Sequence, residues 1–93
     1  MYEIIPTNKF KKDLKRIKKR SPDGFQLLSD FLIILQNKGA KGIPTKMRPH
    51  KLKGHYTDNW ECHLKPDLLV IWIQREKEKT IHLVRIGSHS DLF

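Results

Sequence analysis

Apolar residues recur at helical spacing in the first part of the chain. Phe10, Leu14 and Ile17 are separated by four and three residues, and Thr7 just before them is a good N-cap. The spacing predicts a helix over residues 7–20, with one narrow apolar stripe and basic side chains around the rest of its circumference.

A second helix is predicted directly after the first. Ser21 and Pro22 are an N-cap followed by proline at the first helical position, and Gly39 is a typical C-terminal stop. Residues 25–35 are apolar over more than half of the helix circumference, so this should be the buried helix. We expect the two helices to form a hairpin over residues 7–38.

After a loop at 39–46, the pattern changes to that of β-strands. Trp60, Cys62 and Leu64 alternate with polar residues, as in a half-buried strand over 60–65. Residues 68–73 are apolar without a break and are typical of a central strand. A further strand is predicted over 80–86, after the charged turn at 76–79.

Two weaker segments complete the predicted sheet. Residues 47–53 are expected at an edge, because Pro49 has no amide hydrogen to donate to a neighbouring strand. Residues 2–5 are short and β-prone. We therefore predict one α+β domain, residues 1–93, with the helical hairpin on one face of a twisted antiparallel sheet of about four strands.

The turns predict which strand residues lie opposite one another. With a two-residue turn at 66–67 and the next hairpin centred at 77–78, His63 lies opposite Val70, and Val70 lies opposite Arg85. Opposed residues share a face, so this row should lie on the open face; a slip of one residue would reverse the assignment. The same face would carry Glu61, Lys65 and Trp72. The helix-covered face would carry Trp60, Cys62, Leu64, Leu69, Ile71, Ile73, His82, Val84 and Ile86.

Composition indicates a small, basic protein of a reducing compartment. The 93 residues include 19 Lys and Arg against 10 Asp and Glu, a formal net charge of +9. One cysteine cannot form an internal disulfide framework, no run approaches the roughly 18 apolar residues of a membrane span, and no secretory signal is visible. We expect a cytoplasmic protein without a membrane association.

Positive charge is concentrated in two segments. Residues 9–20 contain eight Lys and Arg and one acidic residue. The second cluster contains Lys46, Arg48, Lys51, Lys53 and Lys65, with His50, His55 and His63 among them. One such run is often only a solvated surface, but two clusters with interspersed histidines favour a polyanionic partner such as nucleic acid.

The predicted topology gathers acid–base groups at one end of the sheet. Gly87 should let the chain turn off the sheet and bring His89 near Arg85, and Asp67 lies in the turn at that end. RNA cleavage needs a base for the 2′-hydroxyl proton, an acid for the leaving oxygen and a cation for the phosphorane. Taken singly, each residue has an ordinary explanation: a surface histidine, a turn-forming aspartate, or an arginine paired with Glu61 or Asp67.

Zinc binding is the other chemistry that the histidines suggest. Cys62 and His63 should point to opposite faces of a strand, and no C-x-x-C pair accompanies the finger-like spacing of His50 and His55. We therefore expect no metal site and no cofactor.

Three segments together resemble the YafQ branch of the RelE superfamily, toxins of type II toxin–antitoxin systems. They are PHKLKG at 49–54, WECHLKPD at 60–67 and VRIGSHSDLF at 84–93. The resemblance covers the whole chain, including the helical hairpin. It implies a microbial RNase-like fold, a ribosome-dependent mRNA endonuclease that needs no metal, and inhibition by a small, acidic, partly disordered antitoxin.

The resemblance also implies roles for individual residues. His89 would be the main general acid or base, with His63 and Asp67 as its proton-transfer partners. Arg85 would hold the phosphate, and His50 would make a further phosphate or proton contact. Glu61, where some relatives have aspartate, and Phe93, as a base-stacking wall, would contact the substrate. Phosphates of rRNA or mRNA would be held by Lys11, Lys15, Lys51 and Lys53.

Two other functional classes stay open at this point. A non-catalytic RNA-binding or ribosome-binding module would keep the lysines but would not need His63, Asp67, Arg85 and His89 to converge. A toxin of the same superfamily that inhibits another target by binding would generally lack this set of histidines.

Overall fold

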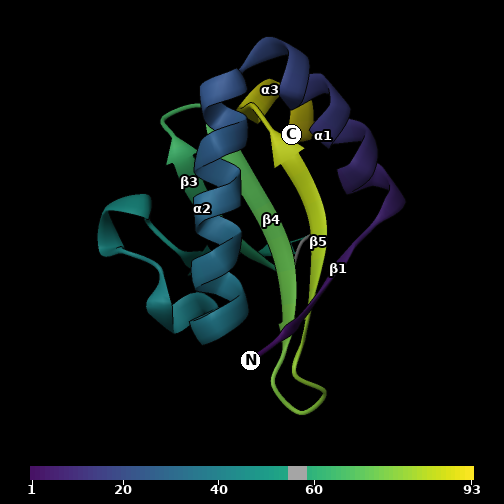
Figure 1. The fold of residues 1–93 in the computed structure, drawn as a ribbon. Coiled ribbons are helices and arrows are strands. Elements are labelled where there is room, and N and C mark those ends of the chain that lie inside the picture. Colours follow the sequence, from purple (N-terminus) through teal and green to yellow (C-terminus); the bar gives the residue numbers. More distant parts are fainter. Residues whose placement is uncertain (55–58) are drawn as a thin grey trace.

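The fold is described by a computed structural model that covers residues 1–54 and 59–93, so His55 of the second basic cluster lies outside the described residues. Two long helices cover one face of a sheet, and a short C-terminal helix follows its last strand (Figure 1). In chain order the elements are β1 (Glu3–Pro6), α1 (Asn8–Arg20), α2 (Pro22–Lys38), the 3-10 helices η1 (Gly39–Gly42) and η2 (Thr45–Met47), β2 (His50–Lys51), β3 (Trp60–Lys65), β4 (Leu68–Arg75), β5 (Thr80–Gly87) and α3 (His89–Leu92).

The predicted helix caps are confirmed. The Thr7 hydroxyl accepts a hydrogen bond from the Phe10 amide at 3.2 Å, and the Ser21 hydroxyl accepts one from the Gly24 amide at 3.2 Å. Pro22 occupies the first helical position of α2, and Gly39 ends this helix with a φ of 68°. That left-handed backbone is one that glycine adopts without strain.

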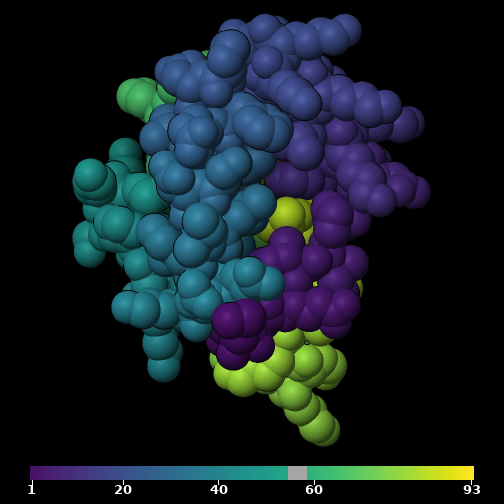
Figure 2. All heavy atoms as spheres, in the orientation of Figure 1, coloured from purple at the N-terminus to yellow at the C-terminus, as the bar shows by residue number. Residues whose placement is uncertain are grey.

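Helix α2 is less buried than its composition predicts. Leu28, Phe31 and Leu35 lie in the core, but Leu27 is 39% exposed and Ile33 is 61% exposed. In Figure 2 the two long helices lie over the sheet, and the β4–β5 hairpin projects beyond them. The outer side of α2 therefore carries apolar residues that the fold itself does not cover.

The sheet has five strands, in the order β1-β5-β4-β3-β2, and it is mixed rather than antiparallel. The predicted segment at 2–5 forms β1, which pairs in parallel with β5, with Ile4 opposite Ile81. The expectation of about four antiparallel strands was therefore one strand short, and β1 runs parallel, not antiparallel, to its neighbour. A parallel pair needs a long connection, here the whole of the intervening chain, and so it leaves no local hairpin signal.

Two bulges overturn the predicted register. The turn at 66–67 has two residues as expected, since Lys65 pairs with Leu68, but His63 then pairs with Leu69 rather than Val70. Between β4 and β5, the predicted register is confirmed from the turn up to Trp72, which pairs with Leu83, and it shifts by one residue at Ile71, which pairs with Arg85. One extra residue stands unpaired at each shift, and a one-residue shift moves side chains to the opposite face.

The two faces of β4 are therefore the reverse of those predicted. Val70 and Trp72 belong to the main core under the helices, with Trp60, Cys62, Leu64 and Ile86. A second, smaller cluster consists of Leu69, Ile71 and Leu92, with Leu52 and Val84 packed against it. Successive side chains of a strand point to opposite faces, and Leu83 and Trp72 face the helices. Their neighbours His82 and Ile73 therefore lie on the face of the sheet that the helices do not cover.

Among the described residues, none of the helices combines the length and apolar character that a membrane span requires.

Candidate active site

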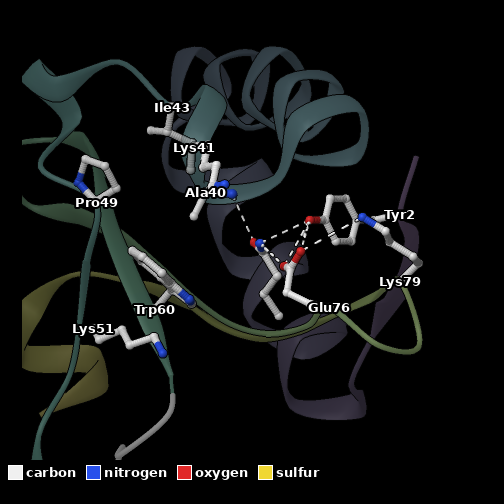
Figure 3. A pocket seen from close by; sticks show the side chains of 10 residues that line it. Tyr2, Ala40, Lys41, Ile43, Pro49, Lys51, Trp60, Glu76 and Lys79 are labelled. Carbon is white, nitrogen blue, oxygen red and sulfur yellow. Dashed lines mark hydrogen bonds and ion pairs between the residues drawn. The ribbon is translucent and has the colours of Figure 1, made fainter.

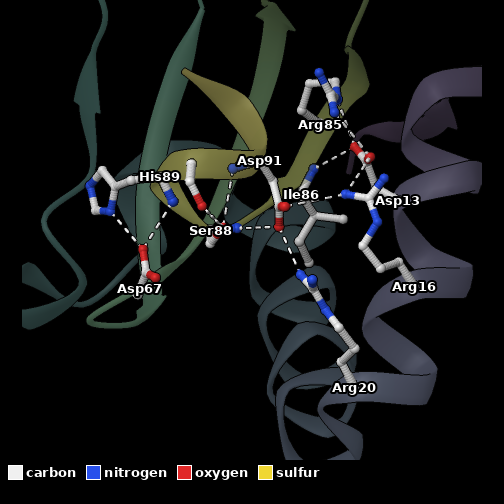
Figure 4. Close-up of polar contacts among 10 residues, drawn as sticks. Asp13, Arg16, Arg20, Asp67, Arg85, Ile86, Ser88, His89 and Asp91 are labelled. Atoms are coloured by element: carbon white, nitrogen blue, oxygen red, sulfur yellow. Dashed lines mark hydrogen bonds and ion pairs between the residues drawn. The ribbon is translucent and has the colours of Figure 1, made fainter.

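The C-terminal helix and the β3–β4 turn bring an aspartate and a histidine together. Asp67 Oδ1 accepts two hydrogen bonds from His89, one from its backbone amide at 2.9 Å and one from Nδ1 at 2.8 Å (Figure 4). A carboxylate on Nδ1 selects the tautomer whose hydrogen is on that nitrogen, and this leaves Nε2 for proton transfer. The predicted meeting of Asp67 and His89 is confirmed.

The electrostatics of this pair favour the ionised carboxylate. The backbone amide of His89, and then its side chain, lower the pKa of Asp67 by hydrogen bonding. Asp67 therefore stays an acceptor over the neutral pH range and holds the imidazole in one orientation.

A line of further side chains runs from His89 across the open face. The rings of His63 and His89 are 5.9 Å apart between centroids. The buried Glu61 lies beyond them, with its Oε1 3.9 Å from His63 Nε2 and 3.3 Å from His50 Nε2. His50 Nδ1 lies 2.7 Å from the carbonyl oxygen of Arg48, so both of its ring nitrogens face an oxygen.

The three histidines line one open cleft. Its volume is about 550 Å³, and its walls are Arg48, Pro49, His50, His63 and His89. We call it the histidine cleft. It brings His50, His63 and His89 together as the sequence predicts, although the row through Val70 that led to this expectation was wrong.

Helix α3, which carries His89, is held from two sides. Ser88 and Asp91 form a capping box, with the Ser88 amide donating to Asp91 Oδ2 at 3.0 Å. Arg20 of α1 donates to the same carboxylate oxygen at 2.8 Å. The first of these bonds is the largest cause that lowers the pKa of Asp91. Gly87 allows this close approach, since a Cβ there would lie 2.9 Å from the Asp91 side chain.

Arg85 does not line the histidine cleft. Its Nε donates to Asp13 Oδ2 of α1 at 2.7 Å, and its Nη2 donates to Asp13 Oδ1 at 3.1 Å. Asp13 is buried, and its Oδ2 also accepts the Ile86 amide at 3.2 Å. The predicted row of His63, Val70 and Arg85 is wrong, because Val70 pairs with Ile86 and Arg85 lies opposite Ile71. The guanidinium of Arg85 binds Asp13.

The predicted RNA contacts are spread over several surfaces. Lys11 and Lys15 are exposed on α1, and Lys53 is exposed after β2. Lys51 is directed away from the histidine cleft, with its Nζ 5.7 Å from the centre of the Trp60 ring. Phe93 is 62% exposed, and its amide donates to the His89 carbonyl at 2.8 Å.

Two residues of this region were given no role in the site from the sequence. Arg48 lines the histidine cleft and holds His50 through its carbonyl, from a left-handed backbone with a φ of 55°. Asp13 is the lone acid among eight basic residues and lies between Phe10 and Ile17 of the buried stripe. An acid on an apolar stripe signals a buried partner.

Cys62 takes no part in this site. It is fully buried, and burial, with a smaller contribution from Glu61, raises the pKa of its thiol to about 12. Within the described part of the chain, no group of three or more His, Cys, Asp or Glu side chains has a geometry that could hold a metal ion.

The comparison with protein families decides the relationship. The family described as the bacterial toxin of type II toxin–antitoxin systems, YafQ, matches residues 2–93. The chain belongs to the YafQ family. No curated protein sequence matches it.

Solved structures of YafQ-like toxins share the fold over the whole chain. A metal-bound toxin from Helicobacter pylori is 42% identical, with a TM-score of 0.88 and complete coverage of both chains. A conserved hypothetical protein from the same organism is 43% identical, with a TM-score of 0.70 and complete coverage of both. YafQ in the Escherichia coli DinJ–YafQ complex is 26% identical, with a TM-score of 0.83 and coverage of 100% of this chain and 99% of that one.

Proposed function

We propose that this toxin is an endoribonuclease that cleaves mRNA on the ribosome by acid–base catalysis and so stops translation. The observation that carries the proposal is the Asp67–His89 pair. The centroid of the His89 ring lies 5.9 Å from that of His63, and both rings line an open, basic cleft. Membership of the YafQ family supports the toxin role.

The proposed reaction uses the substrate as its own nucleophile. The 2′-oxygen attacks the adjacent phosphorus, and the bond from phosphorus to the 5′-oxygen breaks. One group of the site accepts the 2′-hydroxyl proton, and another gives a proton to the leaving 5′-oxygen. The products are a 2′,3′-cyclic phosphate and a 5′-hydroxyl end. His89 is the main acid or base, His63 its partner, and Asp67 the group that orients His89.

The negative charge of the phosphorane needs a cation close to the cleft. Arg85 has this role by resemblance, but its guanidinium is bound to Asp13. Among the described residues that line the cleft, Arg48 carries a permanent positive charge, and His50 beside it offers a further phosphate or proton contact. Glu61 positions both His50 and His63.

The ribosome would supply the alignment that the imidazoles do not. Proton transfer is efficient only when the 2′-oxygen, phosphorus and 5′-oxygen are in line, and free RNA is flexible. The exposed Lys11, Lys15 and Lys53 would contact rRNA or mRNA phosphates, and the exposed Phe93 would stack on a base.

An acidic antitoxin would neutralise the charge of +9. The E. coli YafQ structure is a complex with DinJ, and we propose a cognate partner of that kind here. Co-expression with the neighbouring reading frame and a pull-down at moderate salt test this. Recovery of a small acidic protein is expected, whereas a chain that is harmless to its host and has no partner would contradict a toxin.

The direct test of the reaction is single-turnover cleavage on programmed ribosomes. His89→Ala should slow cleavage on the order of 10²–10⁴-fold, the usual scale for one general acid or base. His82→Gln is the matched control, because His82 lies on the face of the sheet that carries the histidine cleft but does not line the cleft. Ribosome binding should be unchanged in both. Full activity of His89→Ala would contradict the assignment.

A further inference from the structure

A second, larger cavity adjoins the histidine cleft. Its volume is about 710 Å³, and Pro49 lines both cavities. It lies between η1, the edge formed by β2 and β3, and the end of β4 (Figure 3). None of the residues proposed for proton transfer lines it. Its size is in the range of small-molecule sites.

The floor of this cavity is a fixed network of polar groups. Tyr2 Oη donates to Glu76 Oε1 at 2.7 Å, and Gln74 Nε2 donates to Glu76 Oε2 at 2.6 Å. The Ala40 amide donates to Gln74 Oε1 at 2.9 Å and joins η1 to the network. Glu76 keeps its charge, because these bonds from Gln74 and Tyr2 lower its pKa. A ligand therefore meets a carboxylate acceptor that is already in place.

The walls combine aromatic surface with positive charge. The Trp60 ring is stacked on the buried Trp72 ring at 6.1 Å and 12°, so it is backed by the core. Lys51 Nζ lies 5.7 Å from the Trp60 ring centre, and Lys79 Nζ lies 4.8 Å from that of Tyr2. Lys41 is the third ammonium group. Three cations against one carboxylate select an anionic ligand with a flat apolar part.

We propose that this cavity binds one nucleotide of single-stranded RNA, with its base against Trp60 and its phosphate among Lys41, Lys51 and Lys79. Bases stack on aromatic side chains in most single-strand sites, and lysines hold the backbone. Glu76 can accept hydrogen bonds from a base amino group, a donor that the side chains of an acidic peptide do not offer. The inference rests on the proposed function only in taking RNA as the ligand.

The path of β2 connects the two cavities. His50 and Lys51 are consecutive, so their side chains lie on opposite faces of the sheet edge. His50 lines the histidine cleft and Lys51 lines the second cavity. An RNA strand that crosses this edge beside Pro49 contacts both, and the second cavity then holds a nucleotide next to the cleaved bond.

Binding of a 2′-O-methyl RNA heptanucleotide, which the proposed reaction cannot cleave, tests the cavity. Lys79→Glu and Lys41→Glu should each weaken binding and reduce the slope of log K against log salt by about 0.7, the loss of one phosphate contact. Lys77→Glu makes the same charge change on the same hairpin outside the cavity and should bind more like the wild type. Tryptophan fluorescence of the wild type should be quenched by the RNA.

Equal affinity and salt slope in Lys79→Glu, Lys41→Glu and Lys77→Glu would overturn the proposal, as would unquenched fluorescence. If Lys79→Glu and Lys41→Glu bind RNA normally but no longer recover the antitoxin in the pull-down, the proposal would also be overturned, in favour of a protein partner. Thermal melts of all three variants check the fold. Cleavage that depends on His89 would survive any of these failures, so the proposed function is tested separately.

Discussion

At the scale of single residues, the site depends on how Asp67 holds His89. One carboxylate oxygen binds both the amide and Nδ1 of the histidine, so the backbone and the ring are fixed by the same group. Asp67 is exposed, and the pair opens directly onto solvent and the histidine cleft. The pair serves to orient His89, because an exposed ion pair adds little to the stability of the fold.

Asp67→Asn tests this orienting role. The amide keeps the shape but removes the carboxylate that fixes the orientation and tautomer of His89, so cleavage should fall on the order of 10–100-fold, the range for carboxylates that orient metal-bound histidines. The melting temperature should hardly change. Single-turnover cleavage is the measurement, with Asp30→Asn, an exposed aspartate of α2, as the matched control. Wild-type rates in Asp67→Asn would contradict the role.

At the scale of the elements, α1 completes the edge of the sheet. Strand β1 ends with Pro6 opposite Leu83, so none of the described strands borders the rest of β5 on that side. Asp13 of α1 takes that place, by accepting the Ile86 amide and pairing with Arg85. Arg16 and Arg20 of the same helix bind Asp91 of α3. Helix α1 therefore connects the last strand to the helix that carries His89.

Arg85→Ala should therefore destabilise the fold. The Asp13 side chain is 3% exposed and that of Arg85 20%, so the truncation removes the close cation from a buried carboxylate and leaves Arg16 at 4.0 Å. The expected loss is about 3 kcal/mol of unfolding free energy, or roughly 10 °C or more in melting temperature. Arg75→Ala, at the exposed end of β4, is the control. Equal melting temperatures for the two variants would refute a structural role for the pair.

The sequence predicts the elements well and their pairing poorly, for a physical reason. Helix caps at Thr7 and Ser21 and the strand at 60–65 are local signals, and the structure confirms them. The predicted exposure of the polar side of that strand fails at Glu61, which is buried. The bulges near Leu64 and Val84 are set by packing across the sheet and have no local signal. Helix α3 did have one, in the spacing of Ser88 and Asp91.

The candidate site was predicted where it depends on short connections. His89 and Asp67 meet because each lies just beyond the same end of the β4–β5 pair, and this holds whatever the register. The contact of Arg85 with Asp13 was not predicted, because Asp13 lies 72 residues away in the sequence, on a helix whose packing against β5 no pattern in the strand indicates.

At the scale of the whole molecule, a few acidic residues hold a strongly basic chain together. Hydrogen bonds and lysine or arginine contacts lower the pKa of four carboxyl groups, which join elements that are distant in the sequence. They are Asp23, Asp67, Glu76 and Asp91. The contacts of the exposed Asp23, Asp67 and Glu76 each add little alone. All four groups lose their charge together in acid, so the fold should be sensitive to acid.

The sign of this dependence follows from the lowered pKa values. A carboxyl group with a lower pKa in the folded state stabilises the fold above its unfolded pKa of about 4, and the effect is lost as the pH falls through its folded pKa. The urea midpoint should be nearly constant between pH 7 and pH 5 and should fall below about pH 4. Asp91→Asn should show a shallower fall than Glu78→Gln, an exposed control. A midpoint that rises on acidification would contradict this account.

The central claim is that the histidine cleft cleaves RNA by proton transfer, and the end groups of the product test it most directly. A ribosome programmed with end-labelled mRNA is treated with the wild-type protein and with His89→Ala, with and without EDTA, in an excess of Mg²⁺ that keeps the ribosome intact while EDTA binds transition metals. The account predicts a 2′,3′-cyclic phosphate on the upstream fragment and a 5′-hydroxyl on the downstream one, unchanged by EDTA and reduced on the order of 10²–10⁴-fold in the variant. A 3′-hydroxyl with a 5′-phosphate, or activity abolished by the chelator, would contradict it.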